Sequence, residues 1–299
     1  MFKRPETLRR VVLYSAATAA LSGLLWAGFV YPSAVLPDAG TLLEVARMHL
    51  GMAQVIPEQK DGKRLEFRSE QLKLAVEALA KVEQVAPGLA ITRELRAYGS
   101  WIAGDFDDSL RWYEEVLQVP NNTPDVVHKT RVNLAMVRLE KREFDGAIAE
   151  LDKVSVAERD ALWHLSQARV WQTKGDVSLR AKALAAAVAS AKQDEAMLRS
   201  IADTCYAWGD SRALTLYQAL EQRTALVLYR IALLEAAVGN HDSAREALKK
   251  AHADNTPRVA AWIKRDKAVW AKYEEHALLP MSETAGAAAP TPQPVAPGK

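Results

Sequence analysis

The most regular pattern along the chain pairs a small residue with a turn residue seven positions later, and the pair recurs five times. The small residues are Ala97, Ala135, Ala168, Ala202 and Ala232. The turn residues are Gly104, Arg142, Gly175, Gly209 and Gly239. Both series advance by 38, 33, 34 and 30 residues, so one structural unit is repeated. Repetition at this period predicts a solenoid, in which each unit buries its apolar face by stacking on its neighbours.

The hydrophobic pattern around each turn predicts two helices per unit. Apolar residues recur at helical spacing from Leu95 to Ile102, and the same spacing resumes after Gly104, from Phe106 to Leu117. A small residue is needed where the two helices cross, because a larger side chain would push the backbones beyond the usual separation of about 8 to 10 Å. Arg142 stands where the other units have glycine, so we expect that unit to be tilted or irregular.

These alanines and turn residues, with the 34-residue spacing from Ala168 to Ala202, resemble the tetratricopeptide repeat (TPR) family. The resemblance covers residues 90–255. It implies an all-α fold, a right-handed α-solenoid of helix-turn-helix repeats whose first helices line a binding groove. We therefore expect a protein that binds other proteins.

Two further segments extend the repeat region, which we expect to span residues 38–280. Upstream, Leu42–Ile56 reads as the first helix of an additional repeat, and the apolar spacing from Ala75 to Val82 reads as its second helix. Downstream, apolar residues from Val259 to Tyr273 predict one or two short closing helices after Asn255-Thr256-Pro257. The total is about six repeats plus the end unit that a solenoid needs.

An uncharged run of 21 residues, Val11 to Tyr31, follows Lys3, Arg4, Arg9 and Arg10. At 1.5 Å per residue the run covers the roughly 30 Å hydrocarbon core of a membrane, so it predicts one transmembrane helix kept as a signal anchor over residues 11–31. Cleavage as a signal peptide is the alternative, although such peptides have a shorter apolar core of about 7 to 15 residues.

The basic residues give the expected orientation. By the positive-inside rule, residues 1–10 are a cytoplasmic tail and the repeats lie on the other side of the inner (cytoplasmic) membrane, in the periplasm of a bacterium. The alternative interpretation of such an N-terminus is a mitochondrial transit peptide. At the other end, residues 281–299 are rich in proline and alanine, which predicts a disordered tail.

Charge supports this layout. The chain has 39 Lys and Arg against 37 Asp and Glu, a net charge of +2, of which residues 1–10 supply +3. The remainder is therefore close to neutral, at −1, which argues against a nucleic-acid partner. The single cysteine, Cys205, excludes an intrachain disulfide and falls in a predicted helix, where a buried and inert thiol is expected.

Motifs for catalysis, phosphate binding and metal binding are absent from the sequence. The six histidines fall in different units: His49, His128, His164, His241, His252 and His276. The prediction is a protein without enzymatic activity, metal or cofactor. The alternative from another class is an accessory or regulatory subunit of a membrane-associated enzyme complex.

Function is then expected in the groove lined by the first helix of each repeat, where aromatic and arginine side chains typify interface hot spots. By the family register, the groove residues are Tyr98, Trp101, Lys129, Asn133, Met136, Arg169, Arg199, Asp203, Tyr206, Tyr229 and Arg230. Family members that grip a chaperone's terminal carboxylate use basic residues where this chain has Leu162 and Ser166, so that ligand is disfavoured. Self-association into a homo-oligomer, through the membrane helix or the convex face, is a further hypothesis.

Overall fold

The computed structural model describes residues 38–55 and 62–276, and every regular element within those ranges is a helix. Among these residues no helix has both the length and the apolarity needed to cross a membrane. The predicted anchor at residues 11–31 and the predicted tail at residues 281–299 lie outside the described residues.

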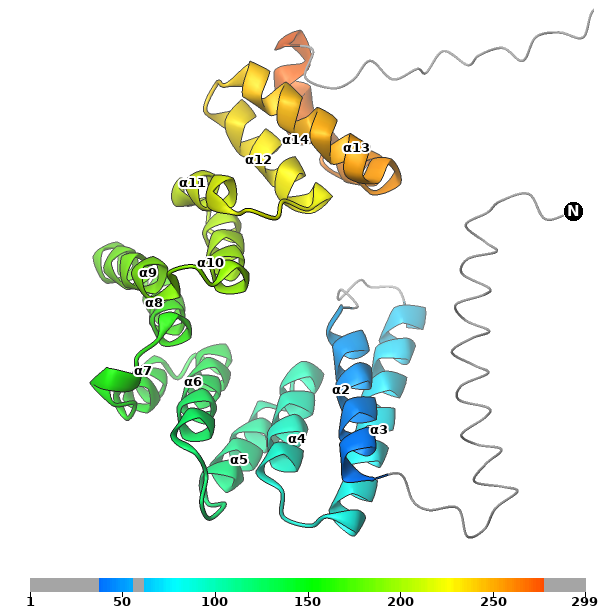
Figure 1. Cartoon of the computed structure of the whole chain (residues 1–299), viewed down its shortest axis with the longest axis vertical. Coiled ribbons are helices and arrows are strands. Elements are labelled where there is room, and N and C mark those ends of the chain that lie inside the picture. The colour runs from blue at the N-terminus through cyan, green and yellow to red at the C-terminus, as the bar shows by residue number, and fades with distance from the viewer. Residues whose placement is uncertain (1–37, 56–61, 277–299) are drawn as a thin grey trace, which may run out of the picture. The chain divides into compact units, whose positions relative to one another are not determined.

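The chain divides into two compact units, with the division between Glu150 and Leu151. Helices α2 to α6 belong to the first unit, and α7 continues two residues past the division. Their bounds are α2 Ala39–Val55, α3 Gly62–Val85, α4 Ala90–Ala103, α5 Phe106–Leu117, α6 Pro124–Glu140 and α7 Phe144–Asp152. Successive helices form hairpins, as Figure 1 shows for α2 with α3 and for α4 with α5.

The second unit contains three more hairpins and a closing segment. The hairpin helices are α8 Ala161–Lys174, α9 Val177–Ala191, α10 Glu195–Ala207, α11 Arg212–Ala219, α12 Ala225–Ala237 and α13 His241–Arg265. The closing segment is the part of α13 after the kink at Asn255, α14 Lys267–Trp270 and the 3₁₀ helix η2 Ala271–His276. A short 3₁₀ helix, η1 Val156–Glu158, precedes α8. The described residues thus hold the predicted six helix pairs, while the right-handedness of their stacking stays a prediction.

All five predicted turns have the same backbone conformation. Gly104, Gly175, Gly209 and Gly239 have φ between 67° and 85°. In each turn the residue's own N–H donates to the carbonyl three positions earlier, and the next N–H donates to the carbonyl five positions before itself. This is the Schellman arrangement that ends a helix on a left-handed residue. The turn positions were therefore correctly predicted from spacing alone.

Arg142 makes this turn as well, so the turn itself keeps the conformation of the glycine turns. Its φ is 61°, its N–H donates to Leu139 O at 2.9 Å, and Glu143 N–H donates to Arg138 O at 2.9 Å. The side chain is exposed, and the two hydrogen bonds of the turn offset the cost of about 1–2 kcal/mol that the left-handed conformation carries for a residue with a Cβ.

The five predicted crossing residues, Ala97, Ala135, Ala168, Ala202 and Ala232, are all 0% exposed. At the first crossing, the hydroxyl of buried Ser109 on α5 donates to the carbonyl of Ala97 on α4 at 2.8 Å. Larger apolar side chains fill the space around the crossings, including Tyr113 in the first unit and Tyr217 in the second. At this first crossing, α4 and α5 thus approach closely enough for a side chain of one helix to bond the backbone of the other.

The closing segment begins at a kink within α13. Asn255 has non-helical angles (φ −154°, ψ 75°), and its side-chain Oδ1 accepts a hydrogen bond from Arg258 N–H at 3.2 Å, which caps the helical turn that follows. Pro257 lies in this first turn, where its missing N–H breaks no helical hydrogen bond. The chain then returns to α12, where Trp270 is 1% exposed. Beyond the kink the chain forms the end of α13, then α14 and η2.

Candidate partner-binding surface

Three predicted groove residues form one stripe along α10. Arg199, Asp203 and Tyr206 are spaced four and three residues apart, which places them on the same side of the helix. All three are half-buried. A stripe that is neither buried nor fully exposed can contact a partner while remaining held by its neighbours.

Arg230 of α12 joins this stripe through Asp203. One nitrogen of its guanidinium, Nη1, contacts Asp203 Oδ1 and also donates to the hydroxyl of Tyr217 at 2.8 Å. The Tyr217 hydroxyl in turn donates to Asp203 Oδ1 at 2.6 Å. The guanidinium carbon lies 5.0 Å from the centroid of the Tyr206 ring and 5.9 Å from that of Tyr217. We refer to Asp203, Tyr206, Tyr217 and Arg230 as the Arg230 cluster.

Burial and charge set the protonation of the cluster's phenols. Burial raises the pKa of Tyr206, and burial together with the bond to Asp203 raises the pKa of Tyr217. Both tyrosines therefore stay protonated at neutral pH, with Tyr217 as donor to the carboxylate. The Arg230 cluster holds one positive and one negative charge in a fixed arrangement.

Arg199 of α10 and Arg169 of α8 connect α10 to its neighbours. Arg199 donates from Nη2 to the carbonyl of Gln222 at 2.9 Å, which ties α10 to the segment before α12. Arg169 of α8 donates from Nη2 to the hydroxyl of Thr204 at 3.4 Å, beside Asp203 on α10. The structure thus brings the second unit's predicted residues Arg169, Arg199, Asp203, Tyr206 and Arg230 to α10 and its two neighbouring first helices.

Tyr229 is the exception in the second unit, because it is 1% exposed. Its hydroxyl donates to Asp266 Oδ2 at 2.9 Å and accepts from the indole N–H of Trp270 at 3.0 Å. The Trp262 ring packs against it with centroids 5.5 Å apart. The expected groove position is therefore occupied by the chain's own closing segment, and Tyr229 is a packing residue.

In the first unit, Tyr98 and Trp101 of α4 are half-buried and meet edge to face, with ring centroids 6.3 Å apart. Glu94, which the sequence reasoning missed, lies one turn before Tyr98 and is half-buried as well. Burial raises the pKa of Glu94, and the positive charges of Lys129 and Arg47 oppose that rise. An acidic and aromatic stripe therefore runs along α4.

The predicted residues on α6 divide by exposure. Lys129 is exposed and its ammonium contacts Asp125 at 2.8 Å, and Asn133 is half-buried. Met136 is buried, 6% exposed, so its side chain packs and the prediction that it faces a partner does not hold. Alignment with the family places Met136 in the groove, but its side chain faces the interior of the hairpin, next to the crossing residue Ala135.

The repeat register identifies some of the residues that were missed. Glu94 lies ten positions before Gly104, as Arg199 lies ten positions before Gly209, so aligning the turns finds it. Tyr217 lies on a second helix, and Arg265 and Asp266 lie in the closing segment, outside the repeat. No sequence signal available from the repeat pattern points to those three.

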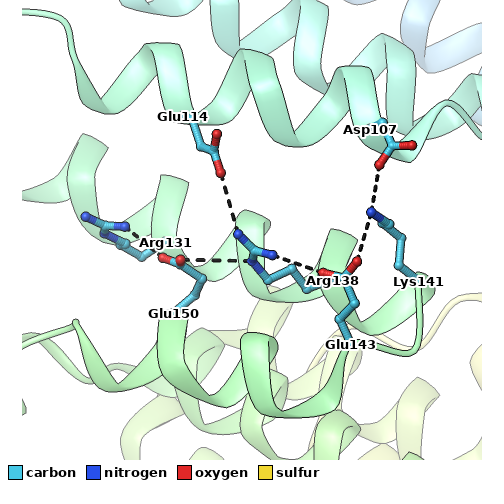
Figure 2. A network of polar contacts seen from close by, with 7 residues as sticks. All are labelled: Asp107, Glu114, Arg131, Arg138, Lys141, Glu143 and Glu150. Atoms are coloured by element: carbon cyan, nitrogen blue, oxygen red, sulfur yellow. Dashed lines mark hydrogen bonds and ion pairs between the residues drawn. The ribbon is translucent and has the colours of Figure 1, made fainter.

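A separate ionic network in the first unit connects α5, α6 and α7 (Figure 2). Arg138 contacts Glu143 at 3.0 Å, Glu114 at 3.5 Å and Glu150 at 4.0 Å, and Arg131 contacts Glu150 at 2.7 Å. Lys141 joins Asp107 at 2.6 Å to Glu143 at 2.8 Å, and this contact lowers the pKa of Glu143. Gly146 leaves room for Arg138, because a Cβ there would lie 3.1 Å from Arg138 Cδ. The network joins α6 to its hairpin partner α7 and the turn between them to α5 of the preceding hairpin.

The cysteine and His241 are packing residues of the helical core and its closing segment. Cys205 is buried as predicted, and burial raises its pKa to about 11, so the thiol stays protonated. The imidazole of His241 packs against Tyr273 with ring centroids 6.2 Å apart. Across residues 38–55 and 62–276, no three His, Cys, Asp or Glu side chains are grouped as metal ligands.

No known family model matches the chain, and no curated protein matches it. Solved structures do. A tetratricopeptide repeat protein from Parabacteroides merdae is 15% identical, with 73% of this chain and 83% of that chain covered and a TM-score of 0.46. PilW, a widely conserved type IV pilus biogenesis factor, is 16% identical, with 71% and 94% covered and a TM-score of 0.46. In the APC/C heterotetramer Cut9–Hcn1, a chain is 16% identical, with 76% and 42% covered and a TM-score of 0.47.

These similarities concern the path of the helical chain. The assignment of the repeat rests on the five identical turns and the five buried alanines at the crossings. On that ground the described residues form a tetratricopeptide-like helical-repeat protein, with α4, α6, α8, α10 and α12 as the first helices of their pairs.

Proposed function

We propose that the protein is a non-enzymatic scaffold that binds other proteins through the first helices of its repeats. The observation that carries this proposal is the Arg230 cluster, where an arginine is fixed by Asp203, Tyr206 and Tyr217 while its surface stays partly open. The side chain of Arg230 is 22% exposed and that of Asp203 45% exposed. Side chains held in place before binding lose little conformational entropy when a partner arrives. Tyrosine and arginine are also the types that dominate interface energetics.

We further propose that residues 11–31 anchor the protein in the inner membrane, with residues 1–10 in the cytoplasm and the repeats outside it. The support is the uncharged 21-residue run after four basic residues. With that placement, the partners are envelope or secreted proteins, and the role is that of a chaperone or assembly factor. A reporter fused after Lys299 should be active only outside the cytoplasm; activity only in the cytoplasm would refute the orientation.

Site-specific photo-crosslinking tests the binding surface. A photoreactive benzoyl-phenylalanine is placed in the full chain at Tyr206, on the first-helix surface, or at Val177, which is 63% exposed on the second helix α9. Adducts with another protein are expected from position 206 and not from position 177. Equal adducts from both positions, or none from position 206, would contradict the assignment.

A further inference from the structure

Glu94, Tyr98 and Trp101 form a stripe along the first helix α4, which we call the α4 stripe. The three residues are spaced four and three positions apart, so they lie on one side of the helix with each side chain next to the following one. All three are half-buried. The rings of Tyr98 and Trp101 meet edge to face, with centroids 6.3 Å apart. The α4 stripe therefore presents one carboxylate beside two aromatic rings.

The polar atoms of the α4 stripe are open to a ligand. The carboxylate of Glu94 forms no hydrogen bond or ion pair with any residue that the structure describes, and neither does the hydroxyl of Tyr98. Neither group belongs to the buried side-chain atoms that lack a hydrogen bond, so the oxygens of both reach the surface. A donor from a partner can therefore approach the carboxylate directly.

The charges around Glu94 leave one negative charge uncompensated. Arg47 of α2 and Lys129 of α6 act on it electrostatically. However, Arg47 contacts Glu44, and Lys129 contacts Asp125 at 2.8 Å. These five side chains sum to −1. Burial raises the pKa of Glu94 even with both cations nearby, so the carboxylate is stabilised by a further positive charge.

The other cations of α4 are directed to the second helix α5. Arg93 contacts Glu115 at 3.8 Å, and the guanidinium carbon of Arg96 lies 4.8 Å from the ring centroid of Trp112. Glu115 and Trp112 both belong to α5, so these arginines serve the hairpin itself. The sequence of the unit is also acidic, because residues 38–150 contain 15 Lys and Arg against 19 Asp and Glu, a net charge of −4. A basic partner segment is therefore favoured here.

Arginine is the basic side chain that fits this surface best. Its planar guanidinium stacks on an aromatic ring and at the same time donates N–H groups to a carboxylate in a fixed fork. Glu94 and Tyr98 lie one helical turn apart, which places their Cβ atoms about 5–6 Å from each other. A single guanidinium can therefore contact the carboxylate and the ring together.

We propose that the α4 stripe binds a segment of another protein by taking up one of its arginine side chains between the carboxylate of Glu94 and the ring of Tyr98. This inference rests on the proposed scaffold function and specifies the chemistry of a partner. It assigns Glu94 as the residue that selects the cation and Tyr98 as the ring on which the guanidinium stacks.

Capture on peptide resins tests this proposal. Each resin carries short acetylated peptides with one fixed central residue, flanked on both sides by positions randomised over uncharged amino acids. The fixed residue is arginine, lysine or citrulline, which keeps the shape of arginine without its charge. The full chain, purified in detergent with a C-terminal epitope tag, is applied to each resin, and the retained protein is measured by immunoassay. The arginine resin should retain about three- to tenfold more protein than the citrulline resin, and more than the lysine resin.

Variants assign the preference to the α4 stripe. Glu94→Gln should remove most of the preference for arginine over citrulline, and Tyr98→Leu should reduce it about two- to fivefold because the ring is lost. Glu70→Gln is the matched control, because Glu70 is an exposed glutamate on α3 of the same unit and its removal changes the net charge equally. It should change the preference less than about twofold. Circular dichroism identifies a variant that fails to fold, and the ratio measured for the wild type needs no variant.

The outcomes separate this proposal from the scaffold function. Equal retention on the arginine and citrulline resins, or an undiminished preference in Glu94→Gln, would overturn the arginine site. An equal loss in Glu70→Gln would show that only the net charge of the unit matters, and equal retention on lysine would remove the selection of arginine. Crosslinking from position 206 probes a different helix, so the scaffold function survives or fails by its own experiment.

Discussion

The guanidinium of Arg230 lies over the ring of Tyr206, 5.0 Å from its centroid, although the two residues belong to different helix pairs. α10 contributes the ring and α12 contributes the cation, so the contact connects neighbouring repeats. Tyr217 of α11 completes the arrangement by holding both Arg230 and Asp203. The same side chains therefore stabilise the stack and shape its surface.

Removing the Tyr217 hydroxyl should lower the free energy of unfolding by about 1 kcal/mol. In Tyr217→Phe, Asp203 loses a donor at 2.6 Å and Arg230 loses an acceptor at 2.8 Å, while the buried ring remains. Urea unfolding followed by circular dichroism measures the change. Tyr206→Phe is the control, because no hydrogen bond of its hydroxyl is found among the described residues. A loss equal in both variants would show that the hydroxyl of Tyr217 has no special role.

Replacing Arg142 by glycine should leave the protein equally stable or stabilise it by up to about 1 kcal/mol. Glycine adopts φ of 61° without strain, but it also adds conformational freedom to the unfolded chain, and the two effects partly cancel. Gly104→Ala should destabilise by about 1–2 kcal/mol, because its φ is 84° and no atom lies within 4 Å of the added Cβ, so the backbone alone accounts for the cost. Thermal denaturation of the two variants checks both signs. A destabilised Arg142→Gly would mean that the arginine side chain contributes a contact of its own.

The repeat positions were predictable because they depend on local chemistry. A left-handed turn favours glycine and a close helix crossing favours a small residue, and both features lie within one hairpin. Gly104 and Ala97 can therefore be recognised in the sequence without knowing where the hairpin lies in the fold. Asp105 caps α5 by accepting from Asp108 N–H, which is a local signal of the same kind. At Arg142 the spacing predicted the turn, although the residue is not the glycine of the other units.

The candidate surface was less predictable, because it depends on contacts between distant residues. The bond from Tyr229 to Asp266 spans 37 positions and that from Trp270 to Tyr229 spans 41. The return of the closing segment onto α12 follows from the kink at Asn255, whose angle the sequence pattern does not specify. The sequence therefore predicted Arg230 and Asp203 as groove residues but not the burial of Tyr229 next to them.

The crossing at Ala202 should not accept a larger side chain. In Ala202→Leu, the added atoms enter a site that is 0% exposed and force α10 and α11 apart, which should cost about 1–3 kcal/mol. Ala207→Leu on the same helix is a matched control, because Ala207 is exposed and should tolerate leucine within about 0.5 kcal/mol. Urea unfolding compares the two. Similar stability of both variants would remove the reason given for the recurring small residue.

The bond between Asp266 and Tyr229 should make the closing segment sensitive to acid. The ion pair with Arg265, followed by the bond from Tyr229, lowers the pKa of Asp266 below its ordinary value near 3.8. A carboxyl whose pKa is lower in the folded state stabilises the fold above its unfolded pKa, and this contribution disappears as the pH falls through the folded pKa. Asp266→Asn should therefore lower the free energy of unfolding by about 1–2 kcal/mol at pH 7 and by almost nothing near pH 2.

Urea unfolding of wild type and Asp266→Asn between pH 7 and about pH 2, followed by tryptophan fluorescence, measures this difference. Trp262 and Trp270 pack against Tyr229, and their emission adds to that of the chain's six other tryptophans. Asp242→Asn is the control, because its side chain is 98% exposed and contacts only Arg245 in the ion pairs that the structure describes around it. If the difference between wild type and Asp266→Asn stayed constant across the pH range, the carboxylate charge would not be what holds the segment, and packing of Trp270 against Tyr229 would have to account for it.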